Sequence, residues 1–407
     1  MFRLLKRCWT PLLSIAFLML GVGYFTTFVS VRMDLDHNSS FLIGIVQAAY
    51  YAGFFIGAIR VERYISRMRH IQAYAFFCSL STCAILLQGL ILSPYAWIAV
   101  RFVMGFCIAS LWVVIESWML IISPKKQRGR LLAFYLIALH GSQSLSQFFL
   151  DFVDTMSLAP FIVTSFLGAL SVLPVTSTKG SMPELEEATP ENIFKIFNAA
   201  PLGVTGCLIS GFIAGAVYTF LPVYAQDLQL SVSLIVSTYI AGGLILQWPI
   251  GILSDLFARG KILLLICLLT AVFSFPMIFV TSNFLFILGL AFLIGGFSFT
   301  IYPVSLALVC DRYSAESITS LTSKMFFAFG LGAVIGPLMV PGFLALFPHI
   351  GLFVYLMAIS IILVVIGLIS MFIRKPVPKE EQENFVALPR NTPIAYELDP
   401  RYEEEKK

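Results

Sequence analysis

Two ionisable side chains, Arg101 and Glu116, interrupt a long apolar run between residues 94 and 122. If this run crosses a membrane, a carboxylate inside it costs several kcal/mol and must face a cavity or a polar partner. Burial favours the protonated form, so Glu116 has the chemistry of a proton site that is loaded and emptied as access changes. The structural alternative is a neutral carboxyl that hydrogen-bonds a neighbouring helix, and the sequence leaves both interpretations open.

Arg101 lies on the same helical face as Glu116, because positions 101, 105, 108, 112 and 116 advance by three or four residues. The two side chains are about 22 Å apart along a helix axis and cannot pair directly. Trp112 lies between them on that face. Arg101 must therefore find its partner in another segment.

The next apolar segment contains a polar stripe at helical spacing, formed by His140, Gln143, Ser144 and Gln147. This stripe predicts a cavity lining beside residues 94–122. Its alternative is a set of interhelical hydrogen bonds, which we favour slightly for the glutamines. His140 titrates near neutrality in principle, although a lone histidine is more often a packing residue.

In the second half of the chain, the candidate cavity residues are mostly aromatic: Tyr218, Gln247 and Tyr302. With Trp112 they would suit an amphipathic organic molecule. Aromatic residues are also common at lipid-facing and interfacial positions, which is the stronger interpretation for any single tyrosine.

The composition shows what must position these residues. Of the 407 residues, 59% are apolar and 12% charged, whereas soluble domains have about 25% charged residues. A soluble globule is excluded, and an all-α polytopic membrane protein is predicted. The net charge of +4 does not indicate nucleic acid binding, and the seven cysteines show no metal spacing. We expect no metal and no cofactor.

A membrane-crossing helix needs about 20 mostly apolar residues, and the chain supplies twelve such segments. Their predicted limits are 11–31, 41–60, 72–92, 94–122, 129–151, 157–175, 201–222, 231–253, 261–281, 283–309, 318–345 and 349–373.

Basic residues set the orientation, because lysine and arginine stay on the cytoplasmic side during insertion. With the N-terminus inside, every basic residue except Arg32, Arg101 and Lys324 falls in an inside segment. Both chain ends are therefore expected in the cytoplasm. The predicted organisation is two six-helix bundles, 1–175 and 201–375, joined by a polar cytoplasmic linker, 176–200, and followed by a disordered cytoplasmic tail, 376–407.

A glycine, an acid and then bases follow the second span of each half. A small residue lets two helices approach, and the bases hold the turn at the lipid headgroups. We expect these turns to switch between conformations. Their residues are Gly57, Glu62, Arg63 and Arg67 in the first half and Gly251, Asp255 and Arg259 in the second.

Small residues inside the spans predict close helix packing. Gly105 and Gly295 occupy matching places in the fourth and tenth spans, while Gly332, Gly336 and Pro337 lie in the eleventh. Six-span halves related in this way suggest a transporter built from repeats, in which one half rocks against the other. The two bundles would then be pseudo-symmetric.

These motifs resemble a known family. The Gly251 turn and the RFVMG sequence at 101–105 are similar to two signatures of the major facilitator superfamily. The sequences WVVIES at 112–117, RGRLLA at 128–133, QWPIG at 247–251 and IYPV at 301–304 resemble its YcaD-like branch of bacterial inner-membrane carriers. Val61 departs from the aspartate of the first-half turn, and the fifth span has only Gly141 in place of the Gly-Pro run typical of proton antiporters.

The resemblance implies a secondary active transporter in a bacterial inner membrane that moves a small organic solute by alternating access. No nucleotide-binding motif is present, so an ion or solute gradient must drive it, and a proton at Glu116 is the first choice. A transport-inactive sensor with the carrier fold is the alternative, and a membrane-embedded enzyme ranks below it. We expect a monomer. Solute, direction and coupling stoichiometry stay open.

Overall fold

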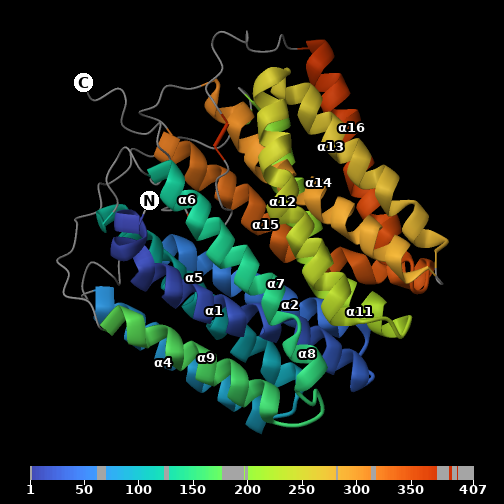
Figure 1. Ribbon diagram of the computed structural model, residues 1–407. Helices are drawn as coiled ribbons and strands as arrows, with labels where there is room; N and C mark the ends of the chain where they lie inside the picture. Colours follow the sequence, from blue (N-terminus) through green and yellow to red (C-terminus); the bar gives the residue numbers. More distant parts are fainter. Residues whose placement is uncertain are drawn as a thin grey trace. The chain divides into compact units, whose positions relative to one another are not determined.

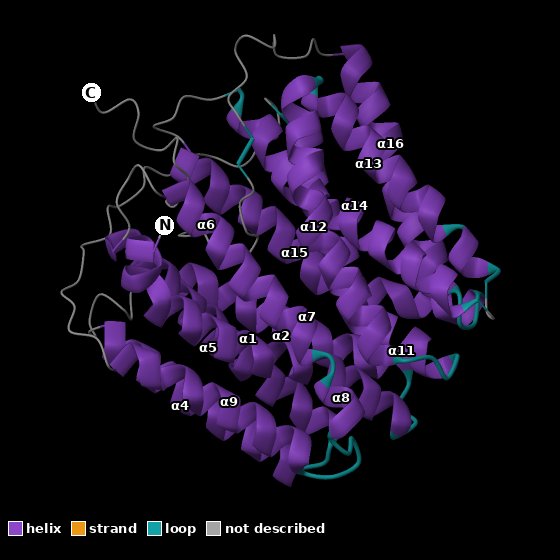
Figure 2. Ribbon diagram, in the orientation of Figure 1, coloured by secondary structure: helices purple, strands orange, loops and turns teal. Residues whose placement is uncertain are grey.

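The computed structural model describes residues 2–61, 70–122, 128–176, 197, 200–280, 283–312, 318–373, 385–386 and 392. Within these residues the regular structure is entirely helical (Figures 1 and 2). Two compact units result: Met1–Ala188 together with Asn391–Lys407, and Thr189–Arg390. Most of the predicted linker and tail lies outside the described residues. Of the predicted tail, only Phe385, Val386 and Thr392 are described.

The first unit contains six predicted spans. Its elements are α1 (Phe2–Leu35), α2 (Ser40–Arg60), α4 (His70–Leu90), α5 (Pro94–Ile122), α6 (Arg128–Leu136), η2 (Ile137–Gly141), α7 (Ser142–Ser146), α8 (Phe149–Phe152) and α9 (Ala159–Thr176). Helix α2 packs mainly on α5, and α1 packs mainly on α9. The helices lie side by side because each presents an apolar surface over most of its length.

The second unit contains the other six. Its elements are α11 (Pro201–Asp227), α12 (Val232–Leu256), α13 (Arg259–Ser274), η3 (Pro276–Ile278), α14 (Phe284–Cys310), α15 (Ile318–Leu346) and α16 (Gly351–Ile373). Helix α12 packs mainly on α14, and α11 packs mainly on α15. The pairing of α12 with α14 is the counterpart of α2 with α5.

Eleven of the described helices are long and apolar enough to cross a membrane, so the predicted all-α polytopic class is confirmed. The remaining prediction, a single helix over 129–151, is wrong in detail. That segment is divided into α6, the π-helical turn η2, α7 and α8. Gly141 ends the π turn, and the Ser146 hydroxyl donates to the Gln143 carbonyl oxygen at 2.7 Å, a side-chain bond that competes with regular helix.

Glycines set the same helix crossing in both units. A Cβ added to Gly53 of α2 would lie 1.9 Å from the Phe102 carbonyl oxygen, and one added to Gly105 of α5 would lie 2.0 Å from that of Tyr50. In the second unit, a Cβ added to Gly242 of α12 would lie 2.0 Å from a carbonyl oxygen of α14. One added to Gly295 of α14 would lie 1.9 Å from a carbonyl oxygen of α12. Only glycine allows backbones to approach this closely.

The loops that follow the first helix of each unit also repeat. His37 and Gln229 each adopt a left-handed φ, 56° and 55°. Two residues later, Ser39 and Ser231 cap the next helix by accepting a backbone N–H three positions on. The two halves thus share a turn conformation although their sequences differ there.

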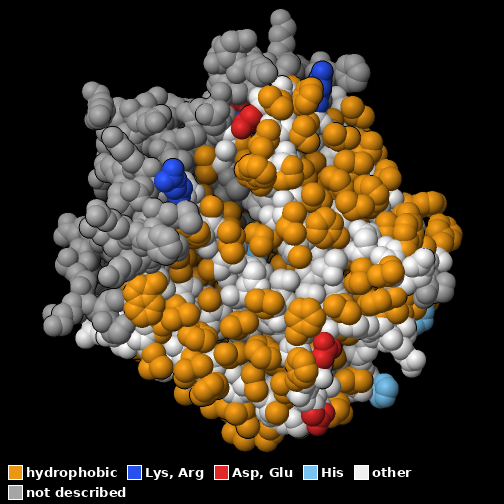
Figure 3. Space-filling model, viewed as in Figure 1, with side chains coloured by type: hydrophobic (Ala, Val, Ile, Leu, Met, Phe, Trp, Pro, Cys, Tyr) orange, Lys and Arg blue, Asp and Glu red, His pale blue; other side chains and the backbone are white. Residues whose placement is uncertain are grey.

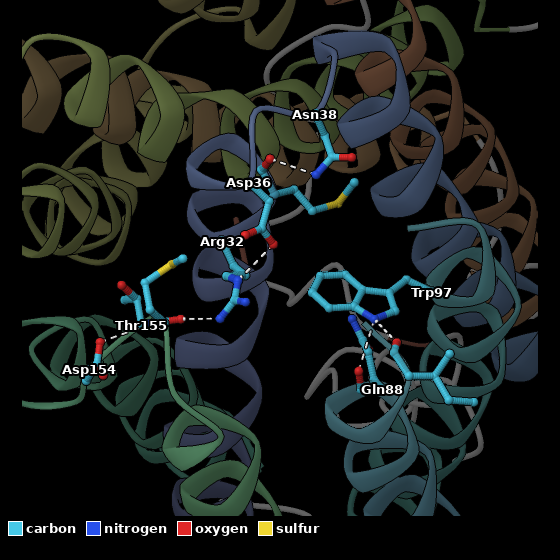
Figure 4. Close-up of polar contacts among 10 residues, drawn as sticks. Arg32, Asp36, Asn38, Gln88, Trp97, Asp154 and Thr155 are labelled. Atoms are coloured by element: carbon cyan, nitrogen blue, oxygen red, sulfur yellow. Dashed lines mark hydrogen bonds and ion pairs between the residues drawn. The ribbon is translucent and has the colours of Figure 1, made fainter. Parts of the chain in front are cut away.

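Arg32, one of the three basic residues that fall outside the inside segments, lies buried in the last turn of α1. Figure 4 shows its guanidinium between two loops: Nε donates to Asp36 at 2.8 Å, and Nη1 donates to the Thr155 carbonyl oxygen at 3.0 Å. In the same unit, the Trp97 indole N–H donates to carbonyl oxygens at the end of α4, including that of Gln88. The Arg32 contacts hold the end of α1 against the loop before α9, and the Trp97 contacts hold the start of α5 against the end of α4.

Apolar side chains dominate the described surface visible in Figure 3, and charged ones are few. Large apolar residues such as Phe152, Trp248 and Leu285 are more than 70% exposed. A soluble protein does not tolerate such a surface, whereas the hydrocarbon of a bilayer covers it without cost.

Candidate functional site

Glu116 lies fully buried on α5. Tyr135 of α6, itself fully buried, donates its hydroxyl hydrogen bond to Oε1, and the Thr392 hydroxyl donates to Oε2. Both carboxylate oxygens therefore have hydroxyl partners. Because a hydroxyl can donate or accept, the same partners can serve the ionised and the protonated acid.

Arg101 is also fully buried on α5, and its partner comes from α2. Its Nη2 donates to Gln47 Oε1 at 2.5 Å, and its guanidinium carbon lies 4.3 Å from the centre of the Tyr50 ring. No described carboxylate forms an ion pair with it. The positive charge is thus stabilised by an amide oxygen and an aromatic face.

Gln47 is held by α1, since its amide donates to the Thr26 carbonyl oxygen at 2.9 Å and to the Ser30 hydroxyl at 2.8 Å. Arg101 Nε has no hydrogen-bond partner among the described residues. A buried donor without a partner is rare in proteins, and here it belongs to a charged group.

Trp112 lies between the two ionisable residues on α5 and is half-buried. Its ring packs edge-on against Phe54 with centroids 5.0 Å apart. Its indole N–H is buried and has no acceptor among the described residues. This N–H is a second donor, beside Arg101 Nε, that an acceptor could satisfy.

The polar stripe of the fifth span does not follow one regular helix, because η2 intervenes. His140 lies in η2, buried, with Nδ1 3.4 Å from Gln143 Oε1. Gln147 is buried against α1, and its amide donates to the Gly23 carbonyl oxygen at 3.2 Å. This geometry favours the interhelical hydrogen-bond alternative for Gln147.

In the second unit, two of the three candidate cavity residues, Tyr218 and Tyr302, pack against aromatic rings. Tyr218 on α11 packs against the rings of Tyr239 and Phe299, each with centroids 6.4 Å away. Tyr302 on α14 is fully buried against Phe329 of α15, and Gln247 on α12 is buried. The ring contacts support packing roles for the two tyrosines.

A small apolar cavity in the second unit, lined by residues of α11, α12, α14 and α16 together with Met277, measures about 10 Å³. That volume is at the lower limit for a single water. It is too small for an organic solute.

The charged turn of the second unit is built around Arg259, which is buried at the start of α13. Its guanidinium pairs with Asp255 at 3.1 Å and with Asp311 at the end of α14. It also donates to the Ala307 carbonyl oxygen at 3.3 Å. The turn thereby ties three helices, α12, α13 and α14, together at one end.

Gly251 was predicted to let two helices approach, and its nearest neighbour outside its own helix is an aromatic ring. The atoms nearest to a Cβ built on it belong to the Phe385 ring, at 2.3 Å and 2.4 Å. In the first unit, a Cβ added to Gly57 would lie 2.6 Å from the Phe106 carbonyl oxygen of α5. Glu62, Arg63 and Arg67 lie outside the described residues.

Helices α11 and α15 cross at glycines as well. A Cβ on Gly332 would lie 2.1 Å from the Leu208 carbonyl oxygen, and one on Gly336 would lie 2.3 Å from that of Phe212. The Pro337 ring packs at 2.8 Å from the position of a Cβ on Gly215. The three small residues therefore lie at a single helix interface.

Several partners of the candidate residues had gone unrecognised in the sequence: Gln47, Tyr135, Asp311 and Thr392. Gln47 alone carried a local signal, as an amide inside the apolar second span. The others become significant only through contacts with residues distant in the chain.

Twelve apolar segments in two similarly built units, with ionisable side chains buried inside a span, are the architecture of a membrane transporter. The sequence profile of the Major Facilitator Superfamily matches residues 12–233 and 227–397. The chain belongs to this superfamily and is a multi-pass membrane transporter.

Two Escherichia coli proteins illustrate the relationship. The chain is 29% identical to an uncharacterized MFS-type transporter, YcaD, from strain IAI39 of serotype O7:K1, over 354 residues that cover 85% of this chain and 91% of YcaD. It is 28% identical to YcaD of strain SE11 over the same shares. The predicted resemblance to this branch is confirmed.

Solved structures show the same fold. The nucleoside transporter NupG matches with a TM-score of 0.73 and 12% identity, covering 91% of this chain and 99% of NupG. A bacterial homologue of the human lysosomal transporter Spinster, inward-facing and unoccupied, matches with a TM-score of 0.67 and 14% identity, covering 92% and 99%. At these identities the likeness establishes the fold.

Proposed function

We propose that this chain moves a small organic solute across a bacterial inner membrane by alternating access and couples that movement to protons at Glu116. The observation that supports the proposal is the complete burial of this carboxyl within α5, between hydroxyls that can serve either protonation state. An acid inside a span is functional by default because its burial is costly. If the position were needed only for helix packing, an apolar side chain would fill it without the free-energy cost of burying a carboxyl.

The donors left without partners suggest the solute's chemistry. Arg101 Nε and the Trp112 indole N–H both need acceptors, and Tyr50 adds an aromatic face. The two donors are about 16 Å apart along α5, so a small solute with one acceptor group and an apolar or aromatic body would satisfy one of them at a time. Arg101 is the one arginine or lysine among the candidate cavity residues, which disfavours multiply charged anions such as sugar phosphates.

The proposed topology has twelve crossings and places both chain ends in the cytoplasm, because the basic residues gather at the inner ends of the spans. We propose that the monomer is the working unit, since each six-span unit supplies its own packed core.

The solute is found first. Purified protein is screened for thermal stabilisation by amino acids, sugars, nucleosides and amphipathic drug-like molecules, because a ligand that binds only the folded form stabilises it by mass action. Nucleosides are included because NupG is a nucleoside transporter. A solute that stabilises the protein is then tested for flux into proteoliposomes. Binding without flux would favour the sensor alternative.

Glu116→Gln tests the coupling. The amide mimics a permanently protonated acid, so we expect the variant to exchange solute across the membrane but to lose accumulation driven by a pH gradient. Asp36→Asn, an acid-to-amide change in an outer loop, is the control and should accumulate normally. Full pH-driven accumulation by Glu116→Gln would remove Glu116 from the mechanism.

A further inference from the structure

One edge of the Arg101 guanidinium is only partly used. Nε and Nη2 lie along the same side of this planar group, and together they form a fork that can hold a carboxylate by two parallel hydrogen bonds. In the structure, Nη2 donates to Gln47 Oε1 at 2.5 Å, whereas Nε has no acceptor among the described residues. An edge shaped for two acceptors therefore meets one.

The other contacts of the guanidinium do not supply a negative charge. Nη1 donates to Met104 Sδ at 3.5 Å, and a thioether sulfur is a weak acceptor. The rings of Tyr50 and Phe25 lie 4.3 Å and 5.8 Å from the guanidinium carbon. No described carboxylate lies within ion-pairing distance of Arg101. Much of the free-energy cost of burying this cation is thus not offset.

Gln47 occupies the place that an anion would take. Its amide oxygen lies where one carboxylate oxygen would meet the Arg101 edge, and its amide nitrogen donates to the Thr26 carbonyl oxygen and the Ser30 hydroxyl of α1. All four residues belong to the first unit. An amide oxygen carries only a partial negative charge. A carboxylate that replaced it would form charge-assisted hydrogen bonds, each about twice as strong as a neutral one.

Aromatic rings extend from the Arg101 edge along α2. The Tyr50 ring is followed by the Phe54 ring, with centroids 6.3 Å apart, and Phe54 packs against Trp112 of α5. Phe54 and Trp112 are half-buried, whereas Tyr50 is buried. A flat apolar or aromatic body attached to the carboxylate would pack against these rings.

We propose that Arg101 binds the carboxylate of an apolar or aromatic monocarboxylate through Nε and Nη2, and that the Gln47 amide oxygen yields its place to this carboxylate. One buried cation balances one negative charge. A dicarboxylate would bring a second, unpaired charge into the apolar surroundings, which is costly. The binding site follows from the contacts around Arg101, whereas its use for transport rests on the proposed function.

Binding is measured as thermal stabilisation of the purified full-length protein. The probes are benzoate and phenylacetate, their neutral counterparts benzamide and phenylacetamide, and the dianion terephthalate, each at millimolar concentration and constant ionic strength. The two monocarboxylates should raise the unfolding temperature, because a ligand that binds only the folded form stabilises it. The amides and terephthalate should not. Absence of an effect from both monocarboxylates, or an equal effect from the amides or from terephthalate, overturns the proposal.

Gln47→Glu tests the site itself. It places a carboxylate of the protein on the Arg101 edge, where it competes with the probe. The apparent Kd of benzoate should rise about ten- to hundredfold, as expected when a hydrogen bond to a charged group is lost. Gln72→Glu, the same change at an exposed position in the first turn of α4, is the matched control and should leave the Kd unchanged.

Arg101→Lys keeps the charge but removes the fork, so it should also weaken benzoate binding. Each thermal shift is referred to the same variant without probe, which separates binding from a change in intrinsic stability. An unchanged Kd in both Gln47→Glu and Arg101→Lys overturns the proposal, because benzoate would then bind elsewhere.

Flux into proteoliposomes separates this inference from the proposed function. If benzoate or phenylacetate binds at Arg101 but is not moved across the membrane, the site stands and the proposed transport of this anion fails. If a neutral solute is carried while neither monocarboxylate binds, the carrier function stands and the carboxylate site fails.

Discussion

Arg101 is a buried cation whose described partners are all uncharged. Its charge is met by the Gln47 amide oxygen, by the Tyr50 ring at 4.3 Å and, at 5.8 Å, by the Phe25 ring. The sequence showed that Arg101 needed a partner off its own helix, but spacing along one segment could not say which helix would provide it. The partner proved to be α2, because the glycine crossing of α2 with α5 brings Gln47 and Tyr50 alongside.

Arg101→Lys should destabilise the folded protein by about 1–2 kcal/mol, because an ammonium lacks the planar face that stacks on Tyr50 and is more strongly hydrated. Arg32→Lys, in the last turn of α1, is the matched control and should cost less, since its ion-pair partner is partly exposed to solvent. Thermal unfolding of the purified variants measures both. Equal stability of Arg101→Lys and the parent protein would show that the stacking contributes nothing.

At the scale of helices, the halves are related by backbone contacts more than by side-chain identity. Gly105 and Gly295 were expected to match from their places in the fourth and tenth spans. A Cβ added to either would lie at nearly the same distance from a carbonyl oxygen of the opposing helix. The partner glycines, Gly53 and Gly242, were not singled out. The interruption of the fifth span by η2 was missed too, because its polar residues recur at the spacing of a regular helix and give no sign of a π-helical turn.

Gly105→Ala and Gly295→Ala should each destabilise by about 1–3 kcal/mol, because an added methyl group forces two closely packed helices apart. Gly289→Ala lies on α14 like Gly295 but meets nothing within 4 Å, so its change in unfolding free energy should be near zero or slightly favourable. Denaturation in detergent, followed by circular dichroism, gives the comparison. If only one of the two substitutions lowers the free energy of unfolding, the two crossings share a geometry but differ in how much they stabilise the protein.

For the whole molecule, most helix limits follow the predicted spans to within a few residues, because each span is determined by the local length of apolar sequence. The exceptions are α1, which begins nine residues earlier, and the divided fifth span. The tail contacts of Phe385 and Thr392 could not be predicted in this way, since they join residues 130 or more positions apart. A polar tail sequence looks the same whether or not two of its residues dock. Local composition therefore specifies which segments cross the membrane, and only the folded chain shows which residues meet.

The orientation of the chain can be tested with single cysteines. Met156→Cys lies in an exposed loop between α8 and α9, Phe347→Cys lies between α15 and α16, and Lys261→Cys lies at the start of α13. Since lysine and arginine remain in the cytoplasm, a membrane-impermeant maleimide applied to intact spheroplasts should label the first two and spare the third until the membrane is permeabilised. The parent chain controls for its exposed Cys83. Labelling of Lys261→Cys in intact spheroplasts would invert the proposed topology and place Glu116 near the opposite face.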